Sequence, residues 1–199
     1  MNRHPSYIDT VEPITLYDEL AEFLGAIEGG LYTISYWEIV KMAGHSCATV
    51  AGAWLMAEAG LKALYREEIP RRGEIRVELK NGVQEKHAGV VGMVLTNITG
   101  ATRDDGFGGI PGGRFNRTGL LHYNAPIETD LRLTRLDTGA SVGVNYRPNK
   151  VVNPMAILMS AIGPDATEED KASFPERFQE MVATVFAHRD EVIEVVTES

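Results

Sequence analysis

The 199-residue chain contains a single cysteine, Cys47. An intrachain disulfide is therefore excluded, and so are zinc ribbons and iron–sulfur clusters that need several cysteines from one chain. Cysteine can supply at most one metal ligand or one nucleophile in this protein.

Long uncharged stretches are also missing. The longest runs without Asp, Glu, Lys or Arg are residues 42–57 and 87–102, each 16 residues long. A membrane-spanning helix needs about 20 apolar residues, so we expect no transmembrane helix and no membrane partner. The first residues contain no apolar run after Arg3, which predicts that a secretory signal is absent. Both observations favour a cytoplasmic location.

The chain has no strongly basic segment. It carries 19 Lys and Arg against 28 Asp and Glu, a formal charge of −9, and residues 165–199 alone hold 10 acidic and 3 basic side chains. Binding to a phosphate backbone needs a concentrated basic face. The charge pattern therefore predicts no nucleic-acid partner.

The composition, with 44% hydrophobic and 24% charged residues, is that of an ordinary globular protein. Hydrophobic periodicity predicts helices and strands in mixed order. We expect an α+β core domain over residues 1–164, followed by an acidic helical segment over residues 165–199 that packs on the core. The expected helices cover residues 14–27, 47–65, 88–99, 155–162 and 173–188, and the expected strands cover residues 31–40, 74–80, 120–124, 131–136 and 140–146.

The first candidate for chemistry is the sequence Gly44-His45-Ser46-Cys47. Imidazole and thiolate are preferred ligands of zinc, and His45 and Cys47 converge if this segment is the turn between a strand and a helix capped by Ser46. Cys47 would then lie at the positive end of the helix, where a thiolate is stabilised. Two alternatives stay open: a metal-free nucleophile with His45 as its base, and a buried, inert cysteine.

A catalytic zinc site usually has three protein ligands. The best third candidate is His122, which lies on an apolar segment, and the other candidates are Asp104, Asp105 and His87. Asp104 or Asp105 could also transfer a proton to or from a metal-bound water. The sequence thus predicts a divalent metal, with zinc as the expected ion, on His45, Cys47 and His122.

Residues 102–113 contain five glycines and one proline, which predicts a long loop. The loop lacks the Gly-Lys-Ser/Thr ending of a phosphate-binding P-loop, and proline stands where a dinucleotide fingerprint needs its last glycine. Nucleotide binding is therefore not expected. A lid over a pocket, with Arg103, Arg114 and Arg117 holding an anionic substrate, is the functional alternative.

The chain resembles the core domain of the FmdE family, which is associated with formylmethanofuran dehydrogenase. The resemblance covers roughly residues 14–150 and rests on four segments: Gly44-His45-Ser46-Cys47, Val50-Ala51-Gly52-Ala53, Gly73-Glu74-Ile75-Arg76-Val77 and Ile98-Thr99-Gly100-Ala101. It implies an α+β fold with a mixed sheet packed by helices, a homodimer, and a metal in the cleft that holds the residues matching His45 and Cys47. It also implies a link to one-carbon metabolism.

The chain departs from the family pattern in three places. Ala43 replaces a histidine that often precedes the first ligand, Ala48-Thr49 replaces the Pro-Gly that commonly follows the cysteine, and no cysteine follows Cys47 to build the C-terminal zinc finger of many members. The leading hypothesis is a metal-binding protein that could act as a metal-dependent enzyme on a small or one-carbon-carrier substrate. The alternative is a non-catalytic accessory or ligand-binding module, and the sequence leaves open whether the protein is an enzyme.

Overall fold

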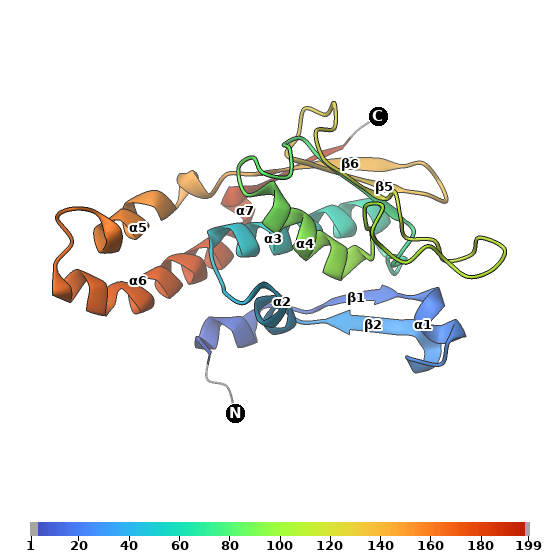
Figure 1. Cartoon of the computed structure of the whole chain (residues 1–199), viewed down its shortest axis with the longest axis horizontal. Coiled ribbons are helices and arrows are strands. Elements are labelled where there is room, and N and C mark those ends of the chain that lie inside the picture. The colour runs from blue at the N-terminus through green and yellow to red at the C-terminus, as the bar shows by residue number, and fades with distance from the viewer. Residues whose placement is uncertain (1–3, 198–199) are drawn as a thin grey trace.

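The computed structural model describes residues 4–197, which form an α+β fold with a mixed sheet, as predicted (Figure 1). The strands are β1 (Ile14–Tyr17), β2 (Leu31–Ile34), β3 (Ile75–Leu79), β4 (Leu121–His122), β5 (Leu131–Arg135), β6 (Ser141–Tyr146) and β7 (Ile193–Thr197). The α-helices are α1 (Glu19–Phe23), α2 (Tyr36–Ala43), α3 (Ala48–Tyr65), α4 (Ala88–Thr99), α5 (Pro154–Ile162), α6 (Glu168–Ala187) and α7 (Arg189–Val192). Short 3-10 helices cover Ser6–Thr10, Glu28–Gly30 and Pro148–Lys150.

The main sheet has five strands in the order β4-β3-β5-β6-β7. Strand β4 runs parallel to β3, and the other neighbouring pairs are antiparallel. The strand predicted over residues 74–80 is confirmed as β3, and the strands predicted over residues 131–136 and 140–146 are confirmed as the antiparallel pair β5 and β6. The C-terminal segment is not helical throughout, because residues 193–197 form the edge strand β7 beside β6.

Helix α3 is the centre of the core. Apart from Glu58 and Lys62 it has no charged residue, and a helix that is apolar on all sides is normally buried. It packs against α4 and against β5, β6 and α6, and Figure 1 shows the sheet on one side of α3 and α4 and the β1–β2 hairpin on the other. Trp54, in the middle of α3, is fully buried.

A glycine lets the sheet approach the first turns of α3. A Cβ atom at Gly52 would overlap ring carbons of Tyr146, the last residue of β6. Real side chains do not come that close, so the tyrosine ring can lie over the helix only because residue 52 has no side chain. This contact fixes one wall of the candidate site described below.

Two predictions for the N-terminal region were wrong. Residues 14–27 form a strand and a short helix instead of one helix, because the Asp18 carboxylate accepts a hydrogen bond from Ala21 N and begins α1 at residue 19. The strand predicted over residues 31–40 forms only as far as Ile34, as β2. Ser35 and Glu38 then form a capping box that begins α2.

The helices predicted at residues 88–99, 155–162 and 173–188 are confirmed as α4, α5 and α6, the last beginning earlier, at Glu168. Helices α5 and α6 pack on each other and extend away from the sheet (Figure 1). Across residues 4–197, no helix combines the length and the apolar character needed to cross a membrane.

Candidate functional site

The segment Gly44–Cys47 joins helix α2 to helix α3. The sequence predicted a turn between a strand and a helix, so the prediction was wrong for the element that precedes the turn. Helix α2 ends at Gly44, whose φ of 77° is the left-handed conformation that suits glycine at a helix C-terminus. Cys47 is the N-cap residue of α3, which confirms that it lies at the N-terminal end of a helix. Ser46 was expected to cap this helix but does not, because its hydroxyl bonds elsewhere.

His45 is exposed, and its Nδ1 atom lies 3.0 Å from the carbonyl oxygen of Ala43. Because a carbonyl only accepts hydrogen bonds, Nδ1 carries the proton in this contact, and in the neutral imidazole Nε2 then has the lone pair. An imidazole oriented in this way resembles many metal-binding histidines, which donate their second N–H to a backbone carbonyl. Nε2 is therefore available as a metal ligand or a base.

Cys47 is half-buried and packs against the hydrophobic core. Its side chain accepts no hydrogen bond from the helix that it caps. The thiol therefore lies at the positive end of an 18-residue helix without neutralising that end by a capping bond.

A chain of hydroxyl groups holds the turn beside Cys47. The Ser46 hydroxyl lies 2.7 Å from the hydroxyl of Tyr36 and 2.8 Å from that of Tyr7, and Tyr7 donates to Gln179 Oε1 at 2.9 Å. Since Tyr7 gives its only proton to Gln179, Ser46 donates to Tyr7 and accepts from Tyr36. The Gln179 Nε2 atom closes the loop by donating to the Ser46 carbonyl at 3.1 Å.

This network connects α2, α6 and the N-terminal 3-10 helix to the turn that precedes α3. Burial raises the pKa of both tyrosine hydroxyls, so they remain protonated donors. Tyr36 is fully buried, which makes an unpaired hydroxyl at this position costly. No sequence pattern indicates the network, because its members are up to 172 positions apart.

His122, the expected third ligand, lies in β4 at the edge of the main sheet and is exposed. Strands β3 and β5 separate β4 from β6, which contributes the tyrosine beside Cys47. Three steps between neighbouring strands amount to roughly 14 Å. His122 therefore lies on a different part of the surface from the Cys47 turn.

Asp104 and Asp105 are exposed residues of the glycine-rich loop. Asp104 lines a surface hollow of about 320 Å³ that His122, Arg103 and Tyr123 also line, so the structure brings two of the predicted site residues together there. His87, the remaining candidate, is exposed at the N-cap of α4. Within residues 4–197, no three His, Cys, Asp or Glu side chains are grouped so that they could hold a metal ion.

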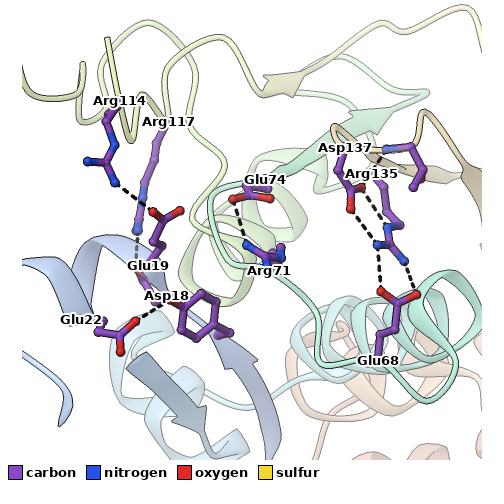
Figure 2. A network of polar contacts seen from close by, with 12 residues as sticks. Asp18, Glu19, Glu22, Glu68, Arg71, Glu74, Arg114, Arg117, Arg135 and Asp137 are labelled. Carbon is purple, nitrogen blue, oxygen red and sulfur yellow. Dashed lines mark hydrogen bonds and ion pairs between the residues drawn. The ribbon is translucent and has the colours of Figure 1, made fainter. Parts of the chain in front are cut away.

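Two of the three arginines predicted to hold a substrate, Arg114 and Arg117, make ion pairs within the chain (Figure 2). Arg117 donates to Asp18 Oδ1 at 2.6 Å, and Arg72 donates to Asp18 Oδ2 at 2.9 Å. Arg114 donates to the exposed Glu19 at 2.9 Å. The buried Asp18 thus ties the glycine-rich loop and the segment before β3 to the start of α1.

Burial alone would raise the pKa of Asp18, but the hydrogen bond from Ala21 N and the two guanidinium groups outweigh it and hold the pKa below its usual range. We define Asp18, Arg72 and Arg117 as the Asp18 clamp. A hollow of about 270 Å³ adjoins it, lined by both of these arginines. Both guanidinium groups pair with the single Asp18 carboxylate, which supports a structural role of the clamp.

A larger cavity of about 430 Å³ lies beside the first turns of α3. We call it the Tyr146 cavity. Its apolar wall comes from α3, β3 and α4 and includes Met56, Leu79 and Val91. Its polar lining comes from residues far apart in the sequence: Thr49, Asn81, Lys86, Asp130, Tyr146, Arg147 and Asn149.

Tyr146 links the cavity to the Cys47 turn. Its hydroxyl donates to the carbonyl oxygen of Ala48 at 2.8 Å, and its ring lies against Gly52. Burial raises the pKa of this hydroxyl, and the negative charge of a Cys47 thiolate would raise it further. The ring therefore lines the cavity while its hydroxyl reaches the residue next to Cys47.

Sequence reasoning placed chemistry at Cys47 but missed the cavity beside it. The cavity is lined by side chains from five separate stretches of the chain, so no local spacing could reveal it. Comparison with protein-family models finds no match, and a search of curated proteins finds no significant relative.

Proposed function

We propose that this protein is a ligand-binding module that takes a small molecule in the Tyr146 cavity. The observation that supports the proposal is the cavity itself: its volume of about 430 Å³ and its apolar wall with a few polar side chains are typical of small-molecule sites. Helices and strands supply the apolar wall, and loops between them supply Asn81, Lys86, Asp130 and Arg147. This corresponds to the second of the two functions that the sequence suggested.

A blocking substitution tests this proposal. Val91 lines the cavity, whereas Met93 lies on the exposed face of the same helix. In a thermal-shift screen of small metabolites, we expect compounds that stabilise the wild-type protein and Met93→Phe but not Val91→Phe. If the screen yields binders and all of them stabilise Val91→Phe equally well, the cavity is not the binding site.

Metal binding at Cys47 is the second candidate, and it follows from the resemblance to the FmdE family. It is supported by the free Nε2 atom of His45 and by the position of Cys47 at the positive end of α3. The described part of the chain supplies no third side-chain ligand at this turn. The donor set therefore falls short of a three-ligand catalytic zinc site, and we derive no catalytic step through a metal.

Metal content tests the second candidate, independently of ligand binding in the cavity. Protein purified without an affinity tag should contain one zinc per chain if Cys47 is a ligand, and Cys47→Ala should lose it. Full zinc content in Cys47→Ala would exclude Cys47 as a ligand. A metal-free nucleophilic cysteine instead predicts that iodoacetamide alkylates Cys47 in protein that contains no zinc.

We also propose that the protein is cytoplasmic and that it forms a homodimer. Helix α5 exposes Met155, Met159 and Ile162 at helical spacing and has no charged residue, as is common in surfaces that associate. Sedimentation velocity at several protein concentrations measures whether the chain forms a dimer.

A further inference from the structure

The Tyr146 cavity has a charge opposite to that of the whole protein. The chain carries a formal charge of −9, yet the cavity is lined by two cations, Lys86 and Arg147, and by one carboxylate, Asp130. An excess of positive charge in a concave site attracts anions and concentrates them at the surface.

The single carboxylate is already engaged. Asp130 Oδ2 accepts a hydrogen bond from the backbone N–H of Tyr146 at 3.0 Å and also forms an ion pair with Arg147. Arg147 in turn donates to the carbonyl oxygen of Tyr146 at 3.0 Å. Asp130 and Arg147 therefore neutralise each other and fix the end of β6.

The charge of Lys86 has no such partner. Among residues 4–197, no carboxylate or hydrogen-bond acceptor pairs with its ammonium group. The side-chain amides of Asn81 and Asn149 also line the cavity and provide neutral donors. The cavity therefore combines one uncompensated cation with hydrogen-bond donors.

The backbone around Lys86 is strained. Lys86 and His87 have φ angles of 45° and 62°, so two consecutive non-glycine residues adopt the left-handed conformation. Backbone hydrogen bonds to Glu85 and Val83 hold the turn, from Ala88 N at 2.8 Å and from Gly89 N at 2.9 Å. Strain of this kind persists only where the surroundings enforce it, and it is common at ligand-binding sites.

The N-terminus of helix α3 adds further positive charge at the cavity. Thr49, in the first turn of α3, lines the cavity, and no side chain caps this helix. The partial positive charge of the helix N-terminus therefore adds to the charge of Lys86.

We infer that the ligand of the Tyr146 cavity is a small oxyanion, a carboxylate or a phosphate compound, whose charged group pairs with Lys86. This inference depends on the proposed ligand-binding function and specifies the class of its ligand. The apolar wall formed by Met56, Leu79 and Val91 would contact the hydrocarbon part of such a compound.

The test uses the full chain and three probes: inorganic phosphate, succinate and the neutral analogue succinamide. Binding is measured by isothermal titration calorimetry for the wild-type protein, for Lys86→Met and for Lys62→Met. Lys62→Met is the matched control, because it removes the same charge from an exposed position in the last turn of α3.

We expect succinate or phosphate to bind the wild-type protein and Lys62→Met with the same affinity, and Lys86→Met about tenfold or more weakly, as for loss of a hydrogen bond to a charged group. Which anion binds better distinguishes a carboxylate ligand from a phosphate ligand. Equal binding of succinate and succinamide, or equal anion binding by Lys86→Met, would overturn the inference.

The blocking variant separates this inference from the proposed function. If neutral compounds bind the wild-type protein but not Val91→Phe, while neither anion binds, the cavity is a ligand site and only its assignment to anions is wrong. If an anion binds Val91→Phe as well as the wild type, both the cavity site and the anion assignment fail.

Discussion

The Asp18 clamp leads to the sharpest stability prediction. The Asp18→Asn substitution keeps the shape of the side chain but removes the one carboxylate charge with which Arg72 and Arg117 both pair. The side chains of these arginines are only 15% and 11% exposed. Removing one partner of a buried ion pair typically costs about 3–5 kcal/mol, because the remaining charge stays buried without compensation. For a protein of this size, that loss lowers the melting temperature by roughly 6–20 °C.

Glu19→Gln is the matched control, since Glu19 pairs with Arg114 in the same region (Figure 2), but both side chains are about half exposed, at 42% and 56%. Exposed pairs contribute about 1 kcal/mol or less. Urea unfolding should therefore leave Glu19→Gln close to wild type and shift Asp18→Asn strongly. A loss below about 1 kcal/mol in Asp18→Asn would refute the reasoning.

The pH dependence of the free energy of unfolding provides an independent check of the Asp18 clamp. The pKa of Asp18 in the folded protein lies below that of an unfolded aspartate, so its contribution is complete above about pH 5 and is lost as the pH falls through the folded-state pKa. The stability difference between wild type and Asp18→Asn should therefore shrink on acidification. A difference that stays constant down to about pH 2 would contradict an ionic role.

Three further substitutions or measurements test other parts of the structure. Gly52→Ala should destabilise the fold by about 1–3 kcal/mol in urea unfolding, because its Cβ would overlap the ring of Tyr146; a neutral or stabilising effect would contradict this close contact. Ser46→Ala should cost about 1–3 kcal/mol in the same assay, since it leaves a buried tyrosine hydroxyl without its partner, and an unchanged urea midpoint would show that the network adds little. An NMR titration should give Asp137 a pKa of about 2, because Arg135 pairs with it at 2.7 Å; a pKa near the ordinary value of about 4 would show that the pair does not form in solution.

The fold was predictable where the local pattern and the final environment agree. Residues 74–80 alternate charged and apolar side chains and form β3, and residues 47–65 are apolar on all sides and form the buried helix α3. The predicted helix at residues 14–27 was wrong, because helical spacing of apolar residues took no account of Asp18 as a capping residue. Phe23 and Leu24, which contribute to that helical spacing, are exposed.

The candidate site was only partly predictable. The sequence identified Cys47 at the start of a helix, because that position depends on neighbouring residues alone. The residues that line the adjoining cavity come from distant segments: Tyr146 from β6, and Lys86 from the turn before α4. Neither has a distinctive sequence motif, and their proximity is created by the order of strands in the sheet.

The structure also explains why the cavity and the cysteine should be tested separately. The Tyr146 ring lines the cavity and its hydroxyl bonds to Ala48, so the tyrosine lies between the cavity and the residue next to Cys47. A ligand held by Lys86 therefore does not need the thiol for binding, whereas a metal on Cys47 does not need the cavity. Anion affinity that depends on Lys86 but not on Cys47, together with zinc content that depends on Cys47 but not on Lys86, would mean two independent sites at one helix end. If each property instead depended on both residues, the ligand and the metal would share one site, and the tyrosine would have to move to open it.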